Sequence, residues 1–102
     1  MKTKYSKNFE KSVRKLSGKT LNSVKNTILD VKKASCIDEI TNCKKLVGYD
    51  NTYRIRIGSL RAFFIFHIQI TDDYVFFKYL VPRGEAYDKK YKEKLREDDK
   101  ES

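Results

Sequence analysis

Hydrophobic residues recur every three or four positions over residues 7–34, which is the spacing of one face of an amphipathic helix. The segment Ser17-Gly18-Lys19 interrupts this pattern. The sequence therefore predicts two helices that form a hairpin, with most of the lysines of this segment on its outer face. Residues 2–6 before the hairpin are either a short strand or a lead-in to the first helix, and residues 35–43 after it are a connection.

Further along the chain the hydrophobic period changes to two, which is the period of a β-strand. The stretch YRIRI alternates strictly. Tyr53, Ile55 and Ile57 are therefore expected to face one side of a sheet, under the helices. Arg54 and Arg56 are expected to project from the opposite side.

The other predicted elements follow from apolar runs and from the turn residues between them. They are an edge strand at 44–49, a turn at 50–51, a tight connection at Gly58-Ser59, a central strand at 61–70, a turn at 71–73, a strand at 74–81 that Pro82 ends, and a closing helix at 85–97. Helices followed by a meander of strands indicate an α+β domain. The expected fold is an N-terminal helical hairpin packed on a small antiparallel β-sheet, with room for a C-terminal helix.

Charge adds a second constraint, because the chain of 102 residues has 23 Lys and Arg against 14 Asp and Glu, a net charge of +9. The excess is concentrated in residues 1–35, which contain ten basic and two acidic residues. Such a surface attracts polyanions such as RNA, DNA or an acidic protein. The alternative, a lysine-rich face that serves only solubility, stays open on charge alone.

Several classes of protein do not fit the sequence. No apolar stretch approaches the roughly 20 residues of a membrane span, and the N-terminus lacks an apolar signal core, so we expect a cytoplasmic protein without membrane contact. Cys36 and Cys43 are too few for a disulfide framework, and His67 is the single histidine. We therefore expect two reduced thiols, no metal site and no cofactor.

The arginines carry the candidate chemistry. Arg61 lies on the strand next to Arg54 and Arg56, across a short turn, and Arg83 follows the next strand with Tyr87 close behind. Guanidinium groups brought together repel one another unless an anion lies between them, and each can grip a phosphate through two parallel hydrogen bonds. Pairing with carboxylates is the alternative, but residues 44–66 contain only one, at position 50. We therefore favour an anion site.

The segment KKLVGYDNTYRIRIGSLRAFFIF, followed by VFFKYLVPRGEAY, resembles the RelE/ParE toxin superfamily of bacterial toxin–antitoxin systems. Members commonly carry a KKLxG-like segment, then YRIRIGxYR, an apolar strand, and a later strand that ends in an HRxxxY-like element. The resemblance covers residues 1–90 as the toxin domain and leaves residues 91–102 as a charged C-terminal tail. It implies a type II toxin that acts with a cognate acidic antitoxin.

RelE-like members are ribosome-dependent endoribonucleases that cut messenger RNA and so inhibit translation. The 2′-hydroxyl attacks the neighbouring phosphate in these enzymes, so no metal is required. By position, Arg54 and Arg56 match the basic pair of the motif, Arg61 its final arginine, and Arg83 and Tyr87 the last element. Chemistry makes Arg56 and Arg61 the candidates for stabilising the charge of the transition state.

The same resemblance gives positional roles to the remaining candidates. Arg83 is the positional candidate for the acid at the leaving oxygen, Tyr87 is placed to stack on a base or to hydrogen-bond near the phosphate, and Lys44 and Lys45 are candidates for RNA binding. His67 shares the strand parity of Arg61, but it lies six residues away, about 20 Å along a strand. We therefore expect it at the far end of the sheet.

The sequence departs from the family pattern at three positions: Pro82 stands in place of a histidine, Gly84 in place of a frequent basic residue, and Leu60 in place of a tyrosine. These changes bear on the nuclease activity rather than on the fold. The alternative function is that of a ParE-like inhibitor of DNA gyrase without nuclease activity.

Overall fold

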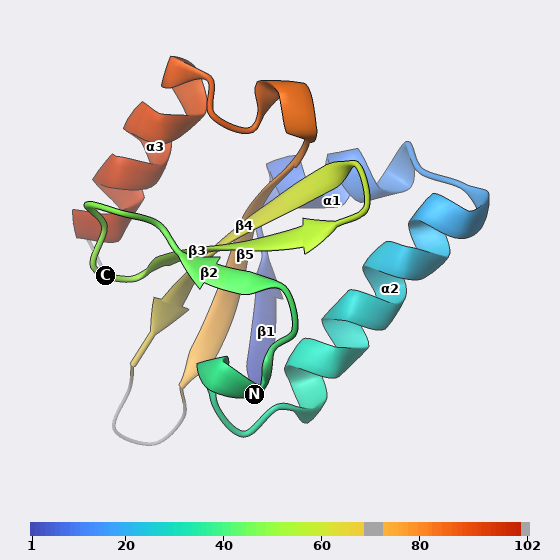
Figure 1. Ribbon diagram of the computed structural model, residues 1–102, viewed down its shortest axis with the longest axis horizontal. Helices are drawn as coiled ribbons and strands as arrows, with labels where there is room; N and C mark the ends of the chain where they lie inside the picture. The colour runs from blue at the N-terminus through green and yellow to red at the C-terminus, as the bar shows by residue number, and fades with distance from the viewer. Residues whose placement is uncertain (69–72, 101–102) are drawn as a thin grey trace.

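A five-stranded sheet forms the centre of the protein, and helices pack against both of its faces (Figure 1). The computed structural model describes residues 1–68 and 73–100. The elements are β1 (Lys2–Tyr5), α1 (Lys7–Arg14), α2 (Gly18–Lys33), β2 (Cys43–Lys45), β3 (Thr52–Ile57), β4 (Leu60–His67), β5 (Tyr74–Pro82) and α3 (Lys89–Lys100), with short 3-10 turns at η1 (Ile37–Glu39) and η2 (Arg83–Glu85). The expected α+β fold with its N-terminal helical hairpin is confirmed, and the C-terminal helix is present.

The strands lie in the order β1-β5-β4-β3-β2. All neighbouring strands run antiparallel except β1, which pairs in parallel with β5. Residues 2–5 are therefore an edge strand and not a lead-in. A local pattern could not settle this point, because the partner of β1 lies about seventy residues further along the chain.

The larger part of the core lies between the sheet and the helical hairpin. Phe9 of α1, Val24 and Val31 of α2 and Ile55 of β3 are all buried in this core. Ser6 caps α1 by accepting a hydrogen bond from the Phe9 backbone N–H at 3.0 Å. Among the described residues, no helix has both the length and the apolar character of a membrane span.

A second, smaller core lies on the opposite face of the sheet, where α3 packs. Leu95 of α3 is buried there against Phe63 and Tyr79 of the sheet and against Tyr49 of the loop after β2. The helix begins at Lys89, because the residues before it form η2 and a turn. The face that carries Arg54 and Arg56 is therefore covered at its centre by α3 and accessible beside it.

The end of α3 is fixed by one buried carboxylate. Asp99 is only 7% exposed and accepts hydrogen bonds from the backbone N–H groups of Asp50 and Asn51, at 2.9 and 2.6 Å, and from the Thr52 hydroxyl at 2.9 Å. Burial alone would raise the pKa of Asp99, but these three hydrogen bonds and the charge of Lys45 outweigh it and lower the pKa. The carboxylate thus ties α3 to the turn between β2 and β3.

Candidate functional site

The predicted division of the YRIRI stretch between the two faces is confirmed. Ile55 and Ile57 are buried under the helical hairpin, and Tyr53 packs against the same core. Arg54 and Arg56 alternate with them along β3 and thus project from the other face. The sheet itself therefore holds both arginines away from the main core.

The strand register brings further basic residues beside these two. Arg56 lies directly opposite Arg61 of β4, and Arg54 lies between Lys44 of β2 and Phe63 of β4. Residues that are direct cross-strand partners share a face of the sheet. Strands β2, β3 and β4 thus place four cations on one face of the sheet, in two adjacent rows of cross-strand partners. The cations are Lys44, Arg54, Arg56 and Arg61.

Arg61 is the most enclosed of the four, with only 7% of its surface exposed. Its Nη1 atom donates hydrogen bonds at 2.9 Å to the carbonyl oxygen of Gly58, in the turn between β3 and β4, and to that of Leu60, the first residue of β4. Gly58 adopts φ +58°, which an L side chain rarely allows, so the turn that holds the guanidinium depends on glycine. Both of these hydrogen bonds are made by Nη1.

The pKa of Arg61 responds to the other candidate residues of the site. Burial lowers the pKa of Arg61, and the charges of Arg54, Arg83 and Arg56 lower it further, while Tyr87 acts in the opposite direction. Like charges disfavour the charged form only when they lie near one another. The structure therefore brings together all five of the residues that the motif singled out.

The last element reaches this cluster through η2. The Arg83 backbone N–H donates to the Ser59 carbonyl at 2.8 Å, which fixes the start of η2 beside the turn that holds Arg61. Tyr87 is 52% exposed, and its ring meets Phe63 edge to face at 6.4 Å between centroids. A half-exposed ring on a buried aromatic support is available to stack on a ligand.

Within residues 1–68 and 73–100, the salt bridges involve none of the arginines of this cluster, which are Arg54, Arg56, Arg61 and Arg83. The Arg56 Nη2 atom lies 3.4 Å from the amide oxygen of Asn42, which is a neutral partner. The alternative that carboxylates neutralise this cluster therefore has no support in the described part of the chain.

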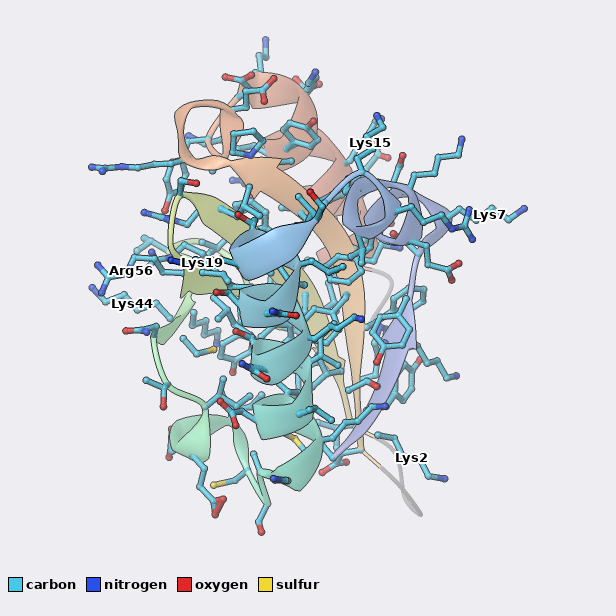
Figure 2. The ribbon with its side chains drawn as sticks, turned by 90° about the vertical axis from the view of Figure 1, so that its right-hand side faces the viewer. Lys2, Lys7, Lys15, Lys19, Lys44 and Arg56 are labelled. Carbon is cyan, nitrogen blue, oxygen red and sulfur yellow. The ribbon has the colours of Figure 1, made fainter. Side chains whose placement is uncertain are left out.

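Two adjoining hollows lie along the basic residues. The smaller, of about 300 Å³, lies between Asn42 and Arg56, and the larger, of about 400 Å³, extends towards α3. Both hollows are lined by Lys44 and Arg54, so they form one groove. Figure 2 shows the Lys44 and Arg56 side chains extending from the same side of the molecule.

Lys45 also lines the larger hollow, together with Lys92 and Arg96 of α3. These two α3 residues were not among the residues predicted for the site, because they fall in a run of mixed charge. Their spacing of four residues was the available signal, since it places both on one face of a helix.

The remaining reactive side chains lie elsewhere. His67 is at the other end of β4 from Arg61, stacked on Tyr74 with 4.6 Å between ring centroids. Burial and the charges of Lys78 and Lys4 lower its pKa. The described residues contain no group of three or more side chains that could hold a metal ion.

No protein-family model matches the chain. Toxin RelE3 of Methanocaldococcus jannaschii is 28% identical to it over 89 residues, which are 86% of this chain and 97% of that protein. Among solved structures, the fold matches the RelB–RelE antitoxin–toxin complex of Methanococcus jannaschii, with a TM-score of 0.66 and 24% identity over 83% of this chain and 95% of that one. It also matches the archaeal RelE–RelB complex of Pyrococcus horikoshii, with a TM-score of 0.65 and 22% identity over 83% and 97% of the two chains.

The intact RelBE toxin–antitoxin complex of E. coli is similar as well, with a TM-score of 0.61 and 20% identity over 79% of this chain and 94% of that one. These matches span nearly the full length of each relative. Together with the motif, they confirm the resemblance found in the sequence: the chain is similar to a RelE toxin along its length and has the fold of the RelE toxins.

Proposed function

We propose that this protein is the toxin of a type II toxin–antitoxin system and cuts messenger RNA on the ribosome in the cytoplasm. One observation carries the proposal: Arg54, Arg56 and Arg83 all lie within electrostatic reach of the enclosed Arg61, without carboxylate partners among the described residues. Such a cluster is suited to a phosphodiester. Similarity to a curated RelE toxin supports the choice of RNA.

The chemistry that fits this cluster needs no metal. The 2′-oxygen of one nucleotide attacks the adjacent phosphorus and gives its proton to solvent water, the bond to the 5′-oxygen breaks, and that oxygen gains a proton in turn. The products are a 2′,3′-cyclic phosphate and a 5′-hydroxyl end. Negative charge grows on the non-bridging oxygens during attack, and the guanidinium groups of Arg56 and Arg61 stabilise it.

The remaining residues of the cluster have supporting roles. Tyr87 stacks on a base beside the cut and so positions the reacting link. Arg83 is the candidate that protonates the leaving oxygen, and Arg54 lies on the side of Lys44, where it holds the RNA backbone. We assign Lys44 and Lys45 to binding of the RNA phosphates.

Similarity to proteins solved as toxin–antitoxin complexes supports a cognate antitoxin as the partner. The net charge of +9 favours an acidic one. Its binding would neutralise the toxin, so the two proteins should co-purify when they are expressed together.

Induced expression followed by mapping of messenger 5′ ends tests the proposal. We expect cuts inside translated codons that are lost in Arg61→Ala and Arg83→Ala, each by about 100- to 1,000-fold. Arg14→Ala, which removes an exposed arginine of α1, is the matched control and should cut normally. Intact messengers with defective DNA supercoiling would instead support the gyrase alternative and overturn the proposal.

A further inference from the structure

The larger hollow lies between the sheet and α3, and we call it the α3 cleft. Its volume is about 400 Å³, within the range of roughly 300–1,000 Å³ that is usual for small-ligand sites. Lys44, Lys45 and Arg54 line it from the sheet side, and Lys92 and Arg96 line it from α3. All the charged side chains of this lining are therefore cations.

The carboxylates of α3 are directed elsewhere, although the helix has a mixed sequence. Asp98 lies 3.4 Å from Lys78, and Glu93 lies 3.7 Å from Lys89 on the exposed side. Asp99 is buried in its hydrogen bonds to the turn between β2 and β3. The helix thus presents its two cations to the cleft and none of these acids.

The cations of α3 are held in place before any ligand binds. Leu95, between them in the sequence, is buried, and the Tyr49 hydroxyl donates to the Lys92 carbonyl at 3.0 Å. The Arg96 guanidinium lies over the Tyr49 ring at 5.1 Å. A cation that is already positioned loses less freedom on binding and so gains more affinity.

Aromatic surface completes the cleft. Phe63 forms part of the lining, and the half-exposed Tyr87 ring stands at its edge with the Lys92 ammonium 5.9 Å from the ring centroid. Cations around an exposed ring are the arrangement with which proteins hold single-stranded nucleic acid, through phosphates and a stacked base. The cleft also continues the groove that leads to Arg56.

We propose that the α3 cleft binds a nucleotide of the RNA next to the cleaved link, with Lys92 and Arg96 holding its phosphate. This inference rests on the proposed function for the identity of the ligand. It adds two binding residues that lie outside the RelE-like motif and makes α3 a wall of the RNA-binding surface. Contacts from both walls of the groove then fix the position of the bound RNA strand.

The test compares two double variants with equal loss of charge. Lys92→Gln with Arg96→Gln removes both cleft cations, whereas Lys89→Gln with Lys100→Gln removes two exposed cations of the same helix. Binding of a fluorescent single-stranded RNA of eight nucleotides is followed by anisotropy from low to moderate salt, without ribosomes. Circular dichroism confirms that both variants are folded.

We expect the cleft variant to bind more weakly and its log–log salt slope to fall by about 0.7, since the two cations hold one phosphate and each phosphate contact on a single strand contributes about 0.7. The control variant should keep the slope of the parent. Equal slopes in both variants, or no binding by the parent at the lowest salt, would overturn the inference. Tighter binding of an acidic peptide than of RNA through Lys92 and Arg96 would overturn it as well.

The two proposals fail in different ways. Binding through the cleft without messenger cleavage in cells would remove the nuclease function and keep the RNA site. Cleavage that depends on Arg61, together with equal RNA binding by the two double variants, would keep the nuclease and remove the cleft site.

Discussion

Arg56 and Arg61 lie directly opposite each other on β3 and β4. Like charges at directly opposed positions destabilise a sheet, and here Arg61 is buried while Arg56 is exposed. A sheet that serves only its own stability would not keep this pair. A phosphate between the two guanidiniums would relieve this repulsion, which links the strand register to the proposed function.

The first prediction concerns the cost of this pair in the free protein. Arg56→Ala should raise the free energy of unfolding at low salt by a few tenths of a kcal/mol, up to about 1 kcal/mol, because it removes the repulsion. The gain should shrink as salt rises, since salt screens the repulsion. Urea unfolding at several salt concentrations measures this gain in stability. Urea is suitable because it is uncharged and leaves the ionic strength unchanged.

Arg14→Ala is the control for Arg56→Ala. It removes the same charge from α1, but its guanidinium lies 3.4 Å from the Glu10 carboxylate, so the loss of a favourable pair should slightly lower stability. A clear loss of stability in Arg56→Ala at low salt would contradict the repulsion argument.

A second prediction follows from the buried carboxylate of α3. Asp99→Asn should lower the free energy of unfolding at pH 7 by about 1–3 kcal/mol, because the asparagine amide group faces N–H and hydroxyl donors that the carboxylate satisfied. Glu97→Gln changes the charge equally at an exposed position and should leave stability almost unchanged. Urea unfolding of the two variants makes the comparison.

The pH dependence of the parent provides a third prediction. The folded protein holds the pKa of Asp99 below its ordinary value, so the carboxylate stabilises the fold fully above about pH 4. That contribution should be lost as the pH falls through the lowered pKa of the folded state. Asp99→Asn should flatten this part of the stability curve; an unchanged curve would show that Asp99 is not its cause.

The sequence predicted the arginine cluster because its geometry is local. Alternation along β3 separates Arg54 and Arg56 from the core, and a short glycine turn brings Arg61 beside them. The position of His67 at the other end of β4 follows from the same strand geometry. These features depend only on the period of a strand and on one hairpin turn.

Long-range packing could not be predicted in this way. α3 has a thin apolar face, and its position depends on Leu95 meeting aromatic residues that are distant in the sequence. Asp99 reads as one more charge in a mixed run, although it is buried and hydrogen-bonded to residues nearly fifty positions earlier. The two α3 cations of the cleft were missed for the same reason, since only the docked helix brings them to the sheet.

The two cysteines should differ strongly in reactivity. Burial raises the pKa of the Cys43 thiol to about 11, with a smaller opposing effect from Arg54, so only about one thiol in a thousand is ionised at pH 8. Cys36 is exposed. Alkylation at pH 8 with peptide mapping should therefore modify Cys36 first and Cys43 much more slowly, and equal rates would contradict the raised pKa of the partly buried Cys43.

Tyr87 allows the ring and the hydroxyl to be tested separately. If the ring stacks on a base, Tyr87→Phe should bind single-stranded RNA as the parent does, whereas Tyr87→Ala should bind about 5- to 150-fold more weakly, the equivalent of about 1–3 kcal/mol per stacked base. Both variants keep Phe63, but only Tyr87→Phe keeps the edge-to-face contact between the two rings. Anisotropy with the same RNA measures binding, and thermal unfolding shows whether Tyr87→Ala is still folded. Weak binding by both variants would assign the role to the phenol hydroxyl, because the phenylalanine ring offers the same stacking surface without it.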